Sequence, residues 1–217
     1  MNLADLKAEL IGDWSPSKDS TNTTGLTLIG SKLLDEFRVM IEQVHDRKIP
    51  GEIVETGVWR GGACIWAAAV LECLKSDKKV YVCDSFCGLP LVSDPKETIS
   101  YDDAESLRVS LEEVEANFDR FGLKHRAVFV KGWFKDTMPS LNIPVSVLRL
   151  DGDMYESTRD VLKYMYDRVS PGGFVIVDDY QLPPCKQAVD ELRARKKIRG
   201  KLPLRPGVFW QKPRRFT

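Results

Sequence analysis

The residues best suited to chemistry are four aspartates that directly follow two apolar runs. The runs and their aspartates are Val147–Leu150 with Asp151 and Asp153, and Gly173–Val177 with Asp178 and Asp179. Such runs are typical of buried parallel strands, whose carboxyl ends form the ligand-binding edge of an open α/β sheet. Carboxylates gathered at one edge repel each other unless a cation or a shared proton compensates. The pattern therefore indicates a divalent metal site, with the alternative that these aspartates only cap the helices that follow.

The ligand types narrow the choice of cation. No histidine or cysteine accompanies the aspartates closely enough in sequence to complete a zinc set. Mg²⁺ prefers oxygen ligands and keeps positions open for water or substrate, so it can activate a hydroxyl group that is a poor nucleophile at neutral pH. The sequence favours Mg²⁺, with Mn²⁺ or Ca²⁺ suited to the same ligands, over Zn²⁺.

A second candidate feature is a glycine-bearing turn after a short strand at residues 51–56. Gly57 and Gly61 allow a tight turn and a close approach of the backbone to a ligand. The turn has Trp59 where the dinucleotide-binding fingerprint has its middle glycine, so by itself it could serve packing only. The next strand ends in Asp84, which is placed to accept hydrogen bonds from ribose hydroxyls. The two features together predict a ligand that carries a ribose.

The elements that position these residues alternate between strand and helix, which predicts a doubly wound, mostly parallel α/β sheet. Apolar spacings of three and four predict a helix over about residues 26–48, and residues 208–210 are read as a last strand, antiparallel to the others. We expect one domain over residues 26–217, after a flexible N-terminal extension at residues 1–25. The stretch 88–106 predicts a lid or binding loop, with a loop without function as the alternative.

The composition argues against several classes of partner and location. The 217 residues carry 32 Lys plus Arg and 32 Asp plus Glu, so no overall field favours nucleic acid. Five cysteines without a complete zinc set indicate a reduced, cytoplasmic protein. The N-terminus lacks the apolar core of a signal peptide, and no run approaches the roughly 20 apolar residues needed to cross a bilayer. We expect no membrane segment, and the composition leaves a homo-oligomer open.

Five motifs occur in a fixed order: Glu55–Gly62, Asp84–Pro90, Gly132–Phe134, Leu148–Thr158 and Pro171–Tyr180. With these motifs the chain resembles class I S-adenosylmethionine-dependent methyltransferases and, more narrowly, the macrocin O-methyltransferase (TylF) family. The resemblance covers roughly residues 26–212 and implies a Rossmann-like class I methyltransferase fold. It also implies Mg²⁺-dependent methylation of a sugar hydroxyl, for example on a deoxysugar such as rhamnose in a glycoside, glycan or natural product.

The same resemblance implies roles for individual residues. Asp151, Asp178 and Asp179 would hold the metal, and Asp153 would act as the general base. Three segments would line the S-adenosylmethionine pocket: Glu55, Thr56, Gly57, Val58 and Trp59; Asp84, Ser85, Phe86 and Gly88; and Gly132 with Trp133. Thr27 matches a family segment that folds over the cofactor. The identity of the acceptor is the property that transfers least from the family to this chain. The chain is shorter at its N-terminus than the family's macrolide enzymes, and its lid lacks a histidine that some members carry.

The sequence leaves two other functions open. The Asp151-Gly152-Asp153 motif also resembles the metal motif of nucleotide-sugar glycosyltransferases, although that function leaves Asp178 and Asp179 unexplained. A catalytically silent methyltransferase fold used as a binding module is the other, and the intact aspartates argue against it. Catechol-type methyltransferases carry a lysine where this chain has Met154. Asp153 is then the residue of that turn able to take a proton, which favours an aliphatic alcohol over a phenol as the acceptor.

Overall fold

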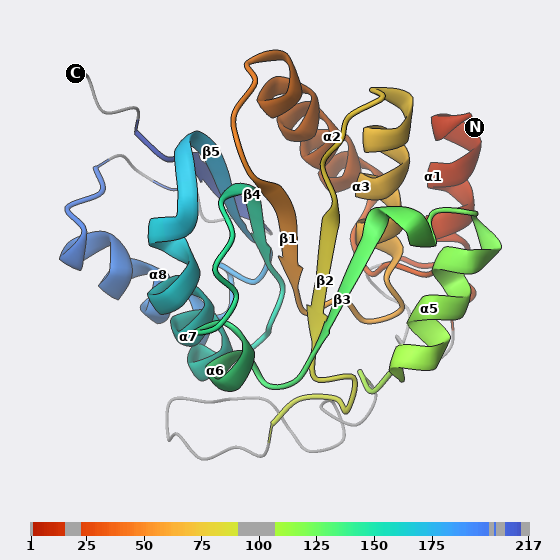
Figure 1. Cartoon of the computed structure of the whole chain (residues 1–217). Helices are drawn as coiled ribbons and strands as arrows, with labels where there is room; N and C mark the ends of the chain where they lie inside the picture. The colour runs from red at the N-terminus through yellow and green to blue at the C-terminus, as the bar shows by residue number, and fades with distance from the viewer. Residues whose placement is uncertain (1, 16–22, 91–106, 200–201, 203–206, 214–217) are drawn as a thin grey trace.

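In the computed structural model six strands form one mixed sheet, and helices cover both of its faces (Figure 1). The structure describes residues 2–15, 23–90, 107–199, 202 and 207–213. The strands are β1 (Glu52–Thr56), β2 (Val80–Asp84), β3 (Ala127–Lys131), β4 (Val145–Leu150), β5 (Val169–Val177) and β6 (Val208–Gln211). Their order is β3-β2-β1-β4-β5-β6, and only the β5–β6 pair is antiparallel. The predicted doubly wound sheet with an antiparallel last strand is confirmed.

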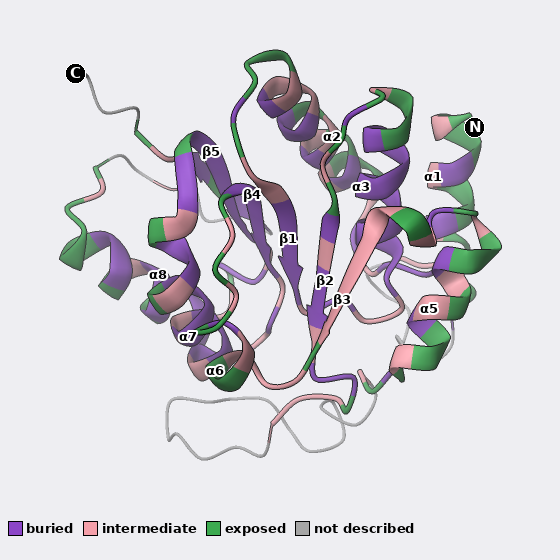
Figure 2. Cartoon of the chain, viewed as in Figure 1, coloured by how far each residue is buried: buried purple, intermediate pink, exposed green. Residues whose placement is uncertain are grey.

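The helices divide between the two faces of the sheet. They are α1 (Leu3–Ile11), α2 (Ser31–Asp46), α3 (Gly62–Cys73), α5 (Leu111–Arg120), α6 (Phe134–Thr137), α7 (Tyr155–Met165) and α8 (Pro183–Arg195), with short 3-10 turns at Lys124–Arg126 and Tyr166–Arg168. Successive strand residues alternate between two cores: Ile53 packs with α1, α2, α3 and α5, whereas Val54 packs with α7 and α8. The central strands are therefore buried on both faces, as Figure 2 shows.

The helix predicted over residues 26–48 begins later and ends slightly earlier, at Ser31 and Asp46. Residues 26–30 instead bridge neighbouring elements, because the Leu26 N–H donates to the Leu10 carbonyl and the Leu26 carbonyl accepts from the Gly62 N–H. Leu26 and Ile29 are buried in the same core as α2, so their apolar spacing continued the helical pattern without a helical backbone. The segment thereby reaches the turn that follows β1.

Within the N-terminal segment predicted to be a flexible extension, residues 1 and 16–22 lie outside the described residues, and residues 3–11 depart from the expectation. Leu6 and Leu10 of α1 are buried in the core that α2 and α3 share, so residues 3–11 belong to the domain. Of the predicted lid at residues 88–106, positions 91–106 lie outside the described residues. In the part of the chain that the structure describes, no helix has the length and apolar character needed to span a membrane.

Candidate active site

The candidate site lies at the carboxyl ends of β1, β2, β4 and β5, where the strand order reverses between β1 and β4. Open α/β sheets bind ligands in the crevice at such a reversal. Two cavities of about 360 and 350 Å³ occupy this edge. They share Gly57, Asp84, Gly88, Leu89 and Asp151 in their linings, so they adjoin. An elongated ligand could extend through both.

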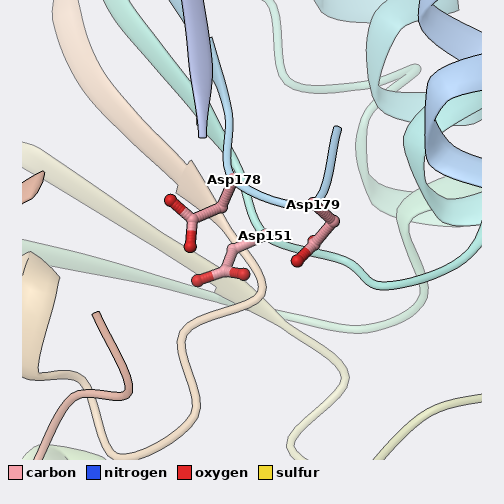
Figure 3. A group of neighbouring side chains, drawn as sticks. All are labelled: Asp151, Asp178 and Asp179. Carbon is pink, nitrogen blue, oxygen red and sulfur yellow. The ribbon is translucent and has the colours of Figure 1, made fainter. Parts of the chain in front are cut away.

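Three aspartates from two neighbouring strand ends converge on one point (Figure 3). Asp151, Asp178 and Asp179 each offer a carboxylate oxygen, and these oxygens lie within 4.8 Å of one another. The backbone fixes this arrangement because the Asp151 N–H donates to Thr56 and the Asp178 N–H donates to Leu150. Burial raises the pKa of Asp178 to about 6, and burial with repulsion from its neighbours raises the pKa of Asp179 well above its ordinary value. Crowded oxygen ligands of this kind fit a hard divalent cation.

Asp153 opens into the same cavity as these three aspartates. Its backbone has φ +57, and its N–H donates to the Asp179 carboxylate over 3.0 Å. Burial, followed by repulsion from Asp151, Asp178 and Asp84, raises the pKa of Asp153 to about 7. The N-cap of α7 is Met154, without a side-chain cap hydrogen bond. Asp153 is therefore not the helix cap that the alternative interpretation required.

Arg149 lies at the candidate site and was not among the residues predicted from the sequence. It lies on β4 directly beside Glu55 of β1, and its side chain is only 2 % exposed. Its guanidinium pairs with Glu55, with Asp151 at 2.9 Å and with Asp178 at 3.0 Å. A signal was present, since a charge inside an otherwise apolar strand must find a partner when it is buried.

The turn after β1 is shaped by its contacts with β4 and β2. Gly57 has φ +84, and a Cβ atom there would lie 1.6 Å from the Asp151 carbonyl oxygen, so only glycine fits. The Val58 N–H donates to the Asp84 carboxylate over 2.9 Å. Gly61, in the left-handed region, caps the start of α3. The glycines are thus explained by close packing at the strand tips as well as by any ligand.

The second-strand loop is folded around Asp84. One carboxylate oxygen accepts from the Val58 N–H and the other accepts from the Phe86 N–H over 2.8 Å. The Ser85 hydroxyl donates to the Gly88 carbonyl over 2.7 Å. Asp84 still lines both cavities, so it can face a ligand while it holds two turns together.

The structure brings most of the predicted cofactor residues to these cavities. Those that line one or both are Thr27, Gly57, Val58, Trp59, Asp84, Ser85, Gly88, Gly132 and Trp133. Glu55 also lines the second cavity, but its carboxylate pairs with Arg149 and accepts a hydrogen bond from the Cys64 thiol. Thr56 and Phe86 are buried and lie outside the described linings.

Several lining residues have no counterpart in the sequence predictions. Trp14, Leu28, Leu33 and Gln181 border the cavity that contains the aspartates. Trp14 follows α1, in the segment that was expected to be flexible, and nothing in its local sequence points to the distant strand tips. Gln181 stands two residues after Asp179 and could have been found as part of the same motif.

Comparisons with known proteins identify the family and agree with the fold. Residues 10–212 match the family described as macrocin O-methyltransferase (TylF). The chain is 46 % identical over 199 residues to a demethyldecarbamoylnovobiocin O-methyltransferase of Streptomyces niveus, covering 87 % of this chain and 76 % of the relative. It is 43 % identical over 195 residues to an 8-demethyl-8-(2,3-dimethoxy-alpha-L-rhamnosyl)-tetracenomycin-C 4'-O-methyltransferase of Streptomyces olivaceus, covering 85 % and 75 %. The solved structure of the O-methyltransferase NovP is 39 % identical, with a TM-score of 0.85 and 98 % of both chains covered.

Proposed function

The chain belongs to the macrocin O-methyltransferase (TylF) family, and we propose that it methylates a deoxysugar hydroxyl of a natural-product glycoside, with S-adenosylmethionine as donor and Mg²⁺ as cofactor. The relatives' names support an O-methyltransferase over a glycosyltransferase. One name specifies a position on a rhamnosyl group, which supports a deoxysugar as the acceptor class. The resemblance noted in the sequence, and the class of enzyme it implies, are confirmed.

The single observation that carries the proposed chemistry is the cluster of Asp151, Asp178 and Asp179 with Asp153 beside it in one cavity. The cluster offers three carboxylates to a cation and leaves a fourth without an assigned ligand role. Bound Mg²⁺ would act as a Lewis acid that lowers the pKa of a coordinated hydroxyl. The two kinds of carboxylate, ligands and base, are what an aliphatic alcohol needs in order to become a nucleophile.

Asp153 would accept the proton of the sugar hydroxyl as the oxygen attacks the methyl group. Burial and its neighbours hold the pKa of Asp153 at about 7 in the metal-free protein, and a nearby cation would favour the ionised form. Among the residues that the structure describes, none donates a hydrogen bond to this carboxylate, which leaves both of its oxygens available. A base held beside the acceptor oxygen contributes mainly by correct positioning and by proton transfer.

The adjoining cavity would receive the adenosine part of the cofactor. Asp84 would accept hydrogen bonds from the ribose hydroxyls, with Ser85, Gly88, Gly132 and Trp133 around it. Gly57 lies where the two cavities meet, so the methionine part would pass over it toward the aspartates. This order would bring the reactive methyl group to the same side as Asp153.

The acceptor sugar would enter the cavity of the aspartates, past Trp14, Leu28, Leu33 and Gln181. This wall combines apolar and aromatic side chains with one amide. Such a surface suits a deoxysugar, which has an apolar face and a small number of hydroxyl groups. The sugar position and the aglycone depend in part on the predicted lid, most of which lies outside the described residues.

The direct test is mass spectrometry of a panel of deoxysugar glycosides incubated with the protein, S-adenosylmethionine and Mg²⁺. A mass gain of one methyl group that disappears in chelator supports the proposal. Turnover that persists in chelator would remove the metal from the mechanism. Binding of S-adenosylhomocysteine without turnover on any acceptor would favour the silent binding module, and stabilisation by nucleoside diphosphates alone would favour the glycosyltransferase.

A further inference from the structure

The aspartate cluster contains a cation of its own. Arg149 lies beneath the carboxylates: its side chain is 2 % exposed, against 29 % for Asp151 and 15 % for Asp178. An arginine side chain keeps its positive charge in proteins, and the carboxylates of Asp178, Asp151 and Glu55 pair with this guanidinium. The cation is therefore a permanent part of the site, on the side away from the cavity.

The ion pairs of Arg149 occupy two of the carboxylate oxygens that could otherwise bind a metal ion. One guanidinium nitrogen pairs with Oδ2 of Asp151 and the other with Oδ1 of Asp178. Each of these aspartates keeps its second oxygen for another partner. Among the described residues that line the cavity at the aspartates, there is no lysine or arginine. A cation that enters from the cavity would meet carboxylates whose negative charge Arg149 already compensates in part.

We propose that Arg149 is a built-in counter-ion of the metal site, which holds the aspartates together in the metal-free protein and lowers their affinity for the divalent cation. This inference rests on the proposed metal function of the cluster. A guanidinium suits the role because its planar donors can serve carboxylates from three strands at once. The consequence would be a site that is folded before the metal arrives and that binds the metal reversibly.

Two opposite effects decide whether the loss of Arg149 weakens or strengthens the binding of Mg²⁺. If Arg149 only positions the ligands, its removal weakens metal binding, because the carboxylates lose their orientation. If it is a counter-ion, its removal strengthens binding, because a unit positive charge near a divalent cation is repelled by several times the thermal energy even at an effective dielectric constant of about 20. Arg149 contacts two of the three aspartates directly, so we expect the second effect to be the larger and the binding of Mg²⁺ to be tighter.

The experiment is calorimetric titration of the full chain with Mg²⁺, together with thermal unfolding in Mg²⁺ and in chelator, all in the absence of S-adenosylmethionine. Arg149→Met should raise the Mg²⁺ affinity about tenfold or more. It should also lower the melting temperature in chelator by on the order of 10 °C, because a buried charge cluster loses its partner. The stabilisation by Mg²⁺ should then be greater than in the wild type.

Arg168→Met is the matched control. Arg168 donates to the main-chain carbonyls of Met138, Tyr164 and Pro139, so its loss removes a comparable set of hydrogen bonds away from the aspartates. This variant should be destabilised equally with and without Mg²⁺. Arg149→Lys keeps the charge but cannot span three carboxylates, and its Mg²⁺ affinity should stay within about fivefold of the wild type.

An Mg²⁺ affinity that is unchanged or weaker in Arg149→Met would overturn the counter-ion role. If that variant folds only when Mg²⁺ is present, the role is supported. If it does not fold under either condition, Arg149→Lys decides, since a loss of affinity greater than about fivefold would show that geometry rather than charge governs the site. A wild-type protein that binds no Mg²⁺ would instead refute the proposed metal site itself.

Discussion

Replacement of Asp153 by asparagine separates the general base from the metal ligands. The change exchanges one carboxylate oxygen for an amide nitrogen and keeps the shape of the side chain. Asp153 has φ +57, a region in which asparagine is among the best-tolerated residues other than glycine. Its main-chain hydrogen bond to Asp179 is unaffected by the substitution. The variant should therefore fold, and its metal-free form should be at least as stable as the wild type, because the repulsion between this partly buried carboxylate and its acidic neighbours is removed.

The expected loss is in turnover. General-base catalysis typically contributes 10²–10⁴-fold, which corresponds to roughly 2.7–5.4 kcal/mol of barrier at about 1.36 kcal/mol per factor of ten. The substitution removes no helix cap that could add to this loss of turnover, because the N-cap of α7 is Met154 and makes no side-chain cap hydrogen bond. We therefore expect Asp153→Asn to lower kcat about 10²- to 10⁴-fold, without a matching loss of stability.

The assay is product formation by mass spectrometry at saturating S-adenosylmethionine, acceptor and Mg²⁺. Saturation matters because the loss of a neighbouring negative charge should weaken Mg²⁺ binding. Asp190→Asn is the control for the same chemical change: its carboxylate accepts hydrogen bonds from Lys186 and Tyr180 and lies outside the described linings of both cavities. If Asp153→Asn retains turnover within two- to threefold of the wild type, Asp153 is not the base, and the metal alone would have to activate the hydroxyl.

Three further experiments, on two variants and on the wild type, test the same geometry. Asp179→Asn should abolish Mg²⁺-dependent turnover while cofactor affinity persists; calorimetry with S-adenosylhomocysteine checks the second half. Asp84→Ala should weaken S-adenosylhomocysteine about tenfold to a hundredfold, at about 1–3 kcal/mol for an unpaired buried polar group, and calorimetry showing unchanged affinity would refute this role. The same variant should also melt earlier, because Asp84 accepts hydrogen bonds from two main-chain amides. In chelator, the wild-type melting temperature should fall as the pH rises from about 4 to 7. The pKa of Asp153 lies at about 7 in the folded state against about 3.9 in the unfolded chain, so the native state binds more protons across that range. A melting temperature that rises over this pH interval would contradict the predicted direction of the pH dependence.

The main features of the fold were predictable because most strands of the sheet contain a short apolar run that ends at, or directly before, a polar residue. Asp84 ends β2, and Asp151 and Asp178 directly follow β4 and β5. Parallel strands bring such residues to one edge, so their convergence follows from sequence order and sheet topology. The start of α2 was predicted too early because Leu26 and Ile29 are buried and continue the apolar spacing, although their backbone is not helical. Burial alone sets the apolar pattern, and it does not report the backbone conformation.

The acidic half of the site was predictable, whereas its cationic half was not. Asp151, Asp178 and Asp179 stand in two motifs, and the structure brings them within 4.8 Å, although their role as ligands stays a prediction. Arg149 and its partner Glu55 stand 94 positions apart in the chain, and only the pairing of β1 with β4 makes them neighbours. A carboxylate motif can be recognised within one segment of the sequence. Which charged residue compensates it depends on the register between neighbouring strands, which the local sequence does not show.

Backbone conformation marks the same edge of the sheet independently of charge. Among the described residues, six other than glycine have positive φ: Lys48, Lys75, Lys197, Trp59, Phe86 and Asp153. The three lysines each follow the C-cap of a helix, where a left-handed residue is the usual way to end it. Trp59, Phe86 and Asp153 instead lie in the loops after β1, β2 and β4. Left-handed conformations of residues other than glycine cost on the order of 1–3 kcal/mol each, least for aspartate and asparagine, and persist where the surrounding structure enforces them. The loops of three separate strands are thus held in unfavourable conformations around one pair of cavities, as expected if selection acts on the shape of a binding site rather than on the stability of each loop.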